Sequence, residues 1–272
     1  MPVFLAPDGT SLVFDAYEPT ESRGTILFLP GWLDHAARWS ALGSRLRDAG
    51  FGAYCVDLRG HGRSGGRRGH LSRFSQLLGD LHAFRRAVRQ RSPLPHVLLG
   101  HGFGGLVVLR YLETQPTDAP VAAVVSSPWL SLAFANPGWK RAARRLLADL
   151  WPTAPLHATL DPSHLSRDPV VNAAYAADPL VGRVMTPGAW KEIQWAQLAV
   201  AADGARIETA LLFLMAGEDR VADAHHARAF ADGVRALMQV QWYPEMYHEI
   251  LHDPRAEDAV NDMLRFLAAR RA

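Results

Sequence analysis

The chain has 272 residues, of which 49% are hydrophobic and 21% are charged, with one cysteine and a formal net charge of +2. This composition excludes an intrinsically disordered chain, a disulfide framework and a zinc site built from several cysteines. The length is sufficient for one large α/β domain, or two small ones, with a sizeable core.

The charge pattern and the N-terminus favour neither nucleic acid nor a membrane as a stable partner. The basic run 59–70, RGHGRSGGRRGH, is compatible with an RGG-type nucleic-acid segment, but a Gly-rich loop after a strand is the preferred interpretation. The first residues lack the basic and apolar regions of a secretory signal, and the longest uncharged stretch, 119–139, is interrupted by prolines. We therefore expect a cytoplasmic protein that binds no nucleic acid and has no stable membrane span.

Short apolar runs alternate with longer amphipathic ones along most of the chain. The runs that predict strands are 25–30, 52–56, 95–99, 121–125, 210–215 and 239–242, and those that predict helices are 36–49, 72–91, 103–114, 188–202, 224–237 and 256–269. This alternation predicts an α/β fold with a mostly parallel sheet that has helices on both faces. Residues 127–187 are irregular and rich in Pro and Trp, which predicts a cap inserted into a core formed by 1–126 and 188–272.

The segment 97–112, VLLGHGFGGLVVLRYL, predicts a sharp strand–turn–helix junction. It has the context of a nucleophile elbow, G-x-S-x-G, in which small residues flank a nucleophilic serine. The helix N-terminus behind such a turn offers partial positive charge and free N–H groups to an oxyanion. Here the central position is Gly102, which carries no nucleophilic atom.

A dinucleotide site and a plain Gly-rich turn are the competing interpretations of this junction. Gly100, Gly102 and Gly105 satisfy G-x-G-x-x-G. However, the motif follows the third buried strand, and the acidic residue expected about 20 positions later is missing. We therefore expect no cofactor, whereas the segment alone does not exclude a turn without chemistry.

Several motifs in the right order resemble the α/β-hydrolase superfamily, and within it the monoacylglycerol lipase and lysophospholipase group of serine hydrolases. LPGWLDHAARW (29–39) is similar to the group's oxyanion loop, H-G-x-x-E-H, with Pro30 and Asp34 in place of its first His and its Glu. VDLRGHGRSGG (56–66) is similar to its D-x-R-G-H-G-x-S loop, and 160–171 and 176–181 are similar to its cap and return segments. The group's elbow reads G-H-S-M-G-G, so the chain departs from it at Gly102 and Phe103.

The resemblance implies an acid and a histidine later in the chain, in the order that this fold uses. Asp219 follows the strand 210–215 and matches the acid, with Glu218 as the fallback and a helix-capping carboxylate as the structural alternative. His248 follows the last strand and matches the general base, which Asp219 would orient. His248, Glu249 and His252 also spell the zincin signature H-E-x-x-H, but that motif needs a continuous helix and a third ligand, so we expect no metal.

The same resemblance places the oxyanion hole at the backbone N–H groups of Trp32 and Phe103. Apolar residues under the cap are candidates for an acyl or aryl pocket, with ordinary packing of cap against core as an equal alternative for each. These residues are Trp129, Leu130, Leu132, Phe134 and Trp151. Four polar residues of the two loops, Asp34, His35, Arg59 and His61, are expected to brace the loops by hydrogen bonds.

Gly102 leaves three explanations open for an otherwise complete site. The serine could have been replaced by design to trap an uncleaved ester, the protein could be a natural ligand-binding pseudoenzyme, or His248 and Asp219 could activate water directly. We expect Gly102 to leave the fold intact and to abolish covalent catalysis. The predicted function is therefore a carboxylic ester hydrolase scaffold for a small ester with an apolar acyl or aryl group, which contacts lipid surfaces at most transiently through the cap.

Overall fold

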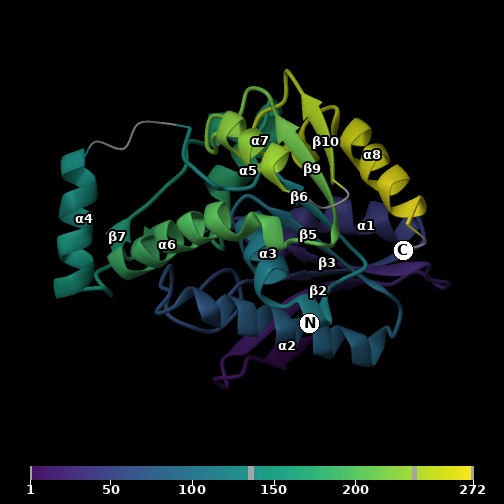
Figure 1. Ribbon diagram of the computed structural model, residues 1–272, viewed down its shortest axis with the longest axis horizontal. Helices are drawn as coiled ribbons and strands as arrows, with labels where there is room; N and C mark the ends of the chain where they lie inside the picture. Colours follow the sequence, from purple (N-terminus) through teal and green to yellow (C-terminus); the bar gives the residue numbers. More distant parts are fainter. Residues whose placement is uncertain (1, 134–137, 235–237, 271–272) are drawn as a thin grey trace.

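The computed structural model describes residues 2–133, 138–234 and 238–270 and contains one large, mostly parallel sheet (Figure 1). Its strands lie in the order β1-β2-β4-β3-β5-β6-β9-β10. The parallel strands are β3 (Gly24–Leu29), β4 (Phe51–Val56), β5 (His96–His101), β6 (Ala122–Ser126), β9 (Ala210–Ala216) and β10 (Met238–Tyr243). The predicted fold class is confirmed.

Helices cover both faces of the sheet because its strands are apolar on both sides. In β3, Ile26 and Phe28 belong to one buried cluster while Leu27 and Leu29 belong to the other, which is the period-2 alternation of a strand. The first cluster includes residues of α1 (Ser40–Asp48) and α8 (Ala256–Ala268). The second includes residues of α2 (Phe74–Arg91), α3 (Phe103–Thr114), α6 (Pro187–Asp203) and α7 (Ala224–Gly233).

Two N-terminal strands were not predicted from the sequence. β1 (Val3–Leu5) and β2 (Ser11–Tyr17) form an antiparallel hairpin, and β2 extends the sheet by antiparallel pairing with β4. Their turn contains Gly9 at φ +82°, a left-handed conformation that glycine adopts readily. The predicted helix 224–237 ends earlier, at Gly233, and residues 235–237 lie outside the described part of the chain.

The segment between β6 and α6 adds no strand to the large sheet within its described residues. It contains α4 (Gly138–Leu150), α5 (Pro169–Ala177) and a separate two-stranded sheet of β7 (Leu156–His157) and β8 (Val184–Met185). Figure 1 shows α4 at the edge of the molecule beside α6. No helix in the described ranges has both the length and the apolar character needed to cross a membrane.

The sheet topology determines where a ligand site can form. β3 pairs with β4 on one side and with β5 on the other, so the strand order reverses at β3. Ligands in open α/β sheets bind outside the carboxyl ends of the strands at such a switch point. The loops that follow β3 and β5 therefore begin side by side, with Leu29 paired to Gly100.

Candidate active site

The turn between β5 and α3 has the geometry expected of a nucleophile elbow, with glycine at its centre. Gly102 has φ +52° and ψ −114°, and its peptide N–H donates to the Ser126 carbonyl oxygen. A Cβ atom at residue 102 would lie 3.2 Å from Nε2 of His248. A Cβ atom at Gly104 would lie only 2.0 Å from the Leu29 carbonyl oxygen, which explains why this turn requires small residues.

His248 and Asp219 form a buried hydrogen-bonded pair beside this turn. Nδ1 of His248 lies 2.9 Å from Oδ2 and 3.1 Å from Oδ1 of Asp219. Because an ionised carboxylate only accepts hydrogen bonds, Nδ1 carries the proton and Nε2 presents its lone pair. The Asp219 side chain is 1% exposed and also accepts the N–H groups of Val221 and Ala222 at 2.8 Å.

The free edge of the His248 ring faces the turn. Within the described residues Nε2 makes no hydrogen bond, and His248 lines the cavity at the carboxyl end of the sheet. Burial disfavours the imidazolium, but the nearby Asp219 carboxylate outweighs this penalty and raises the pKa of His248 above its usual value of 6.5. The neutral ring remains a stronger base than a free histidine.

The amides assigned to the oxyanion hole lie at the starts of the two neighbouring loops. Trp32 follows β3, and Phe103 is the first residue of α3. Neither backbone N–H donates to an acceptor in the described part of the chain. Both residues line the same cavity as His248, and their rings meet edge to face with centroids 4.9 Å apart. The N-terminus of α3 adds a positive partial charge here.

The predicted bracing of the loops is confirmed. Asp34 accepts hydrogen bonds from the His35 backbone at 2.7 Å and from the indole of Trp39 at 2.7 Å. Arg59 donates two hydrogen bonds of 2.6 Å to Asp80. Nδ1 of His61 lies 2.9 Å from the Arg59 carbonyl oxygen, so the basic run is tied to the fold as a loop.

A buried ion-pair network lies next to His248. It gives Glu249 and His252 of the H-E-x-x-H sequence a structural role. Arg38 forms two hydrogen bonds of 2.8 Å with Glu249, and Nδ1 of His252 lies 2.7 Å from the same carboxylate. His252 also stacks on Trp39 at 4.0 Å. The segment passes from a loop into a short 3₁₀ turn, Ile250–His252, so the two histidines do not share one helical face as a zincin requires.

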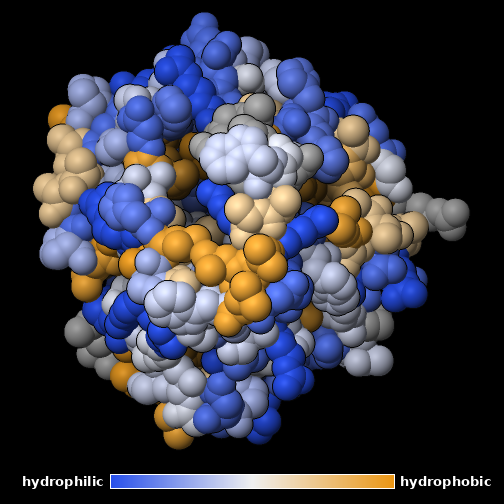
Figure 2. Space-filling model, turned by 90° about the vertical axis from the view of Figure 1, so that its left-hand side faces the viewer, coloured by the Kyte–Doolittle hydropathy of each residue, from blue (hydrophilic) through white to orange (hydrophobic). Residues whose placement is uncertain are grey.

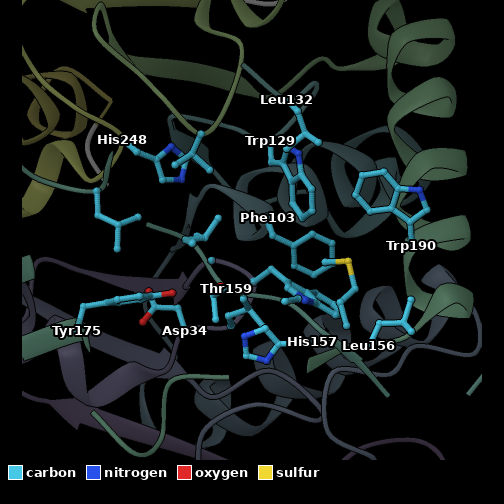
Figure 3. A pocket seen from close by; sticks show the side chains of 18 of the residues that line it. Asp34, Phe103, Trp129, Leu132, Leu156, His157, Thr159, Tyr175, Trp190 and His248 are labelled. Atoms are coloured by element: carbon cyan, nitrogen blue, oxygen red, sulfur yellow. The ribbon is translucent and has the colours of Figure 1, made fainter. Parts of the chain in front are cut away.

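A cavity of about 370 Å³ connects these groups and has two chemically different ends (Figure 3). Beyond His248 the rings of Phe103, Trp129 and Trp190 follow one another, with centroids 6.2 and 6.3 Å apart. We call this end the aromatic arm. Figure 3 shows Tyr175 and Asp34 together on the other side, which we call the polar arm.

The predicted wall residues do not all reach this cavity. Trp129 and Leu132 line it, whereas Leu130 is buried in the core without lining it, and Trp151 is 58% exposed. Phe134 lies outside the described residues. Several lining residues were missed because no local pattern shows which side chains of the segment 127–187, or which face of the helix after it, border a cavity. These are Arg144, Leu156, His157, Tyr175 and Trp190.

Known proteins of similar sequence and structure are ester hydrolases. The chain is 30% identical over 270 residues to a monoacylglycerol lipase of Mycolicibacterium smegmatis. The aligned region covers 98% of this chain and 96% of that protein. It is 26% identical to phospholipase YtpA of Bacillus subtilis over 86% of this chain and 90% of that protein. The crystal structure of a monoacylglycerol lipase from Paleococcus ferrophilus superposes with a TM-score of 0.86 at 28% identity, covering 95% and 99% of the two chains.

A family model supports the same relationship. The model described as serine aminopeptidase, S33, matches residues 20–255, which include β3 to β10 and both members of the His248–Asp219 pair. The sheet and its covering helices match the α/β-hydrolase fold of the structural relatives. The chain therefore belongs to the Hydrolase_4 family of serine hydrolases and is a homologue of the monoacylglycerol lipases within it.

Proposed function

We propose that the chain binds a monoacylglycerol-like or lysophospholipid-like carboxylic ester at the His248–Asp219 pair and forms no acyl-enzyme at residue 102. The observation that carries this proposal is the direction of residue 102. A side chain at residue 102 would point at Nε2 of His248, because its own Cβ atom would lie 3.2 Å from that nitrogen. It would also lie beside the free amides of Trp32 and Phe103. This is the arrangement in which a serine would be deprotonated for attack on a carbonyl held by two N–H groups.

The two arms of the cavity suit the two halves of such an ester. The aromatic arm offers apolar surface to an acyl or aryl group, and the volume of about 370 Å³ lies in the range of small-molecule sites. In the polar arm, the buried hydroxyl of Tyr175 has no partner among the described residues. It can donate to a hydroxyl of the alcohol half, so the site favours an ester of a polar alcohol.

The catalytic roles follow from this placement. With a serine at residue 102, Nε2 of His248 would take the hydroxyl proton and later return a proton to the alkoxide that leaves. Asp219 would hold the ring in the required tautomer, and the amides of Trp32 and Phe103 would stabilise the oxyanion. Gly102 supplies no oxygen, so binding remains while the covalent route is lost. The alternative function is a ligand-binding protein that uses the same cavity without any chemistry.

We also propose that residues 127–187 act as a cap that contacts lipid surfaces transiently. Large apolar side chains gather on the face that carries α4, and Figure 2 shows a hydrophobic band there. Trp139, Leu146 and Leu150 of α4 are 70%, 62% and 75% exposed, and Leu198 of α6 is 71% exposed. Such a surface gains free energy in a lipid interface. Leu146→Ser combined with Leu150→Ser should reduce binding to phosphatidylcholine vesicles severalfold, and unchanged binding would reject the contact.

The test of the proposed function is Gly102→Ser, assayed on p-nitrophenyl esters of short and medium chain length. The serine variant should hydrolyse them and be labelled covalently by a fluorophosphonate, whereas Gly102→Ala, which carries the same Cβ without the hydroxyl, should do neither. The gain should be about 10³-fold or more, because loss of the nucleophile removes most of the catalysis of such a site. A folded serine variant with no esterase activity at any chain length would reject the hydrolase site.

A further inference from the structure

The site retains every group for hydrolysis except a nucleophilic side chain, and the base faces the place that this side chain would occupy. Nε2 of His248 makes no hydrogen bond within the described residues, although the side chain is only 7% exposed. The atoms nearest to a Cβ position at Gly102 are Nε2 and Cε1 of His248 and Cα of Gly31. The two nearest of these atoms belong to the His248 side chain, and the third belongs to the backbone.

We propose that the chain hydrolyses its bound ester directly, with a water molecule in the place beside Gly102 as the nucleophile and His248 as its general base. The proposal rests on the proposed function, because it takes the ester to be bound at the same site. A water molecule needs about 10–15 Å³ of cavity space, and the cavity offers about 370 Å³, so a water molecule takes up only a small part of it.

The reaction balances without a covalent intermediate. The water oxygen bonds to the carbonyl carbon, its proton passes to Nε2 of His248, and the carbonyl electron pair moves onto the oxygen held by the amides of Trp32 and Phe103. The tetrahedral intermediate then collapses, the bond to the alcohol oxygen breaks, and the proton on Nε2 passes to that oxygen. The products are the carboxylic acid and the alcohol, and the neutral His248–Asp219 pair is regenerated.

The electrostatics of the pair support this role. Asp219 accepts hydrogen bonds from the protonated Nδ1 of His248 and from two backbone N–H groups, which fix its carboxylate in place. The carboxylate can therefore stabilise the imidazolium that forms. Besides Asp219, the carboxylates of Asp34 and of the adjacent Glu249 act electrostatically on His248, and the ring of His101 lies beside it with centroids 4.8 Å apart. Burial lowers the pKa of His101 well below 6.5, with a further lowering by His248, so this neighbour stays neutral and does not oppose protonation of His248.

The experiment compares four proteins on p-nitrophenyl octanoate: the native sequence, Gly102→Ala, His248→Gln and His226→Gln. The native chain should turn over the ester without a burst, without an acyl adduct on the intact protein by mass spectrometry and without inactivation by a fluorophosphonate. Its rate should exceed that of His248→Gln by about 100-fold or more, the usual contribution of a general base. His226 is exposed on α7 outside the cavity, so His226→Gln is the matched histidine control with an unchanged rate.

Gly102→Ala provides an independent measurement that leaves His248 and Asp219 in place. Its methyl group would occupy the place of the water molecule, so the rate should fall at least tenfold below that of the native chain. Equal rates in the native chain, Gly102→Ala and His248→Gln would overturn the proposal. An acyl adduct on the native chain would also overturn it, because the adduct would indicate a side-chain nucleophile.

A binding measurement separates this proposal from the proposed function. Binding of the non-hydrolysable ether 1-O-octylglycerol is measured by calorimetry on the native chain. Binding without hydrolysis would reject only the water route, whereas failure to bind combined with an inactive Gly102→Ser variant would reject both.

Discussion

The strongest structural prediction concerns the cost of adding one methyl group at three glycines. Gly9, Gly102 and Gly104 differ in what a new Cβ atom would meet. At Gly9 the backbone is left-handed, with φ +82°, and nothing lies within 4 Å. At Gly102 φ is +52° and the nearest atom is Nε2 of a side chain at 3.2 Å, whereas at Gly104 a backbone carbonyl oxygen lies at 2.0 Å.

These differences set three different losses of unfolding free energy. Gly9→Ala pays only backbone strain, about 1 kcal/mol, part of which is offset by the lower entropy of the unfolded chain. Gly102→Ala adds a tight contact and a rarer backbone conformation, for about 1–3 kcal/mol. Gly104→Ala must move the backbone of a buried strand end, which places it among the exceptional substitutions at about 4 kcal/mol or more.

The assay is urea unfolding followed by tryptophan fluorescence, with thermal unfolding as a second probe. For a chain of 272 residues, 1 kcal/mol corresponds to a change in Tm of about 2 °C. The expected order of destabilisation is Gly9→Ala, then Gly102→Ala, then Gly104→Ala. If Gly102→Ala were as damaging as Gly104→Ala, the turn would have no room for a side chain at residue 102, and the nucleophile-elbow interpretation would be refuted.

Three further predictions concern activity, the cavity and the buried ion pair. Ester hydrolysis by the native chain or by Gly102→Ser should fall as pH decreases, with its midpoint above 6.5 in a pH–rate profile, because the protonated form of His248 cannot act as a base. Leu132→Trp should fill part of the cavity and shift kcat/KM from medium towards short acyl chains, whereas Leu198→Trp on the exposed face of α6 should not. Glu249→Gln should lower the free energy of unfolding by about 1–3 kcal/mol in urea titrations, because Arg38 loses the charge of one of its two buried carboxylate partners and keeps Asp34. The pKa of Glu249 is depressed in the folded chain, so in the native protein this stabilisation should be present above pH 4.5 and lost as the pH falls below it.

The sequence was sufficient to predict the parallel strands of the sheet and the helices that cover it, because local periodicity sets them. α3 was predicted at its observed bounds, 103–114, and the predicted ends of β5 and β9 differ from the observed ones by two residues or fewer. The hairpin β1–β2 was missed because it is short and its alternation is weak. Its pairing with β4 is a long-range interaction that no local pattern reports.

The site residues that follow a strand end could be predicted from the sequence. The residues that line the cavity from the helices beyond β6 could not. Asp219 and His248 follow β9 and β10, so their positions are set by strand ends that the sequence marks. Tyr175 reaches the cavity through the path of the segment between β6 and α6, and Trp190 through the position of α6 itself. That path depends on contacts such as the packing of α4 against α6, which the amino-acid pattern does not specify.

The intact His248–Asp219 pair does not by itself show that the chain is a catalyst, because the pair also stabilises the fold. Asp219 is a buried carboxylate held by His248 and two backbone N–H groups, and loss of the imidazole would leave a buried charge short of a partner. Selection for stability alone can therefore maintain both residues. The free amides of Trp32 and Phe103 are different, because an unpaired N–H group in a buried site gives no stability. A ligand oxygen would supply the acceptor that both N–H groups lack among the described residues, so hydrolysis by the native chain and binding of the ether analogue distinguish a working site from a structural remnant.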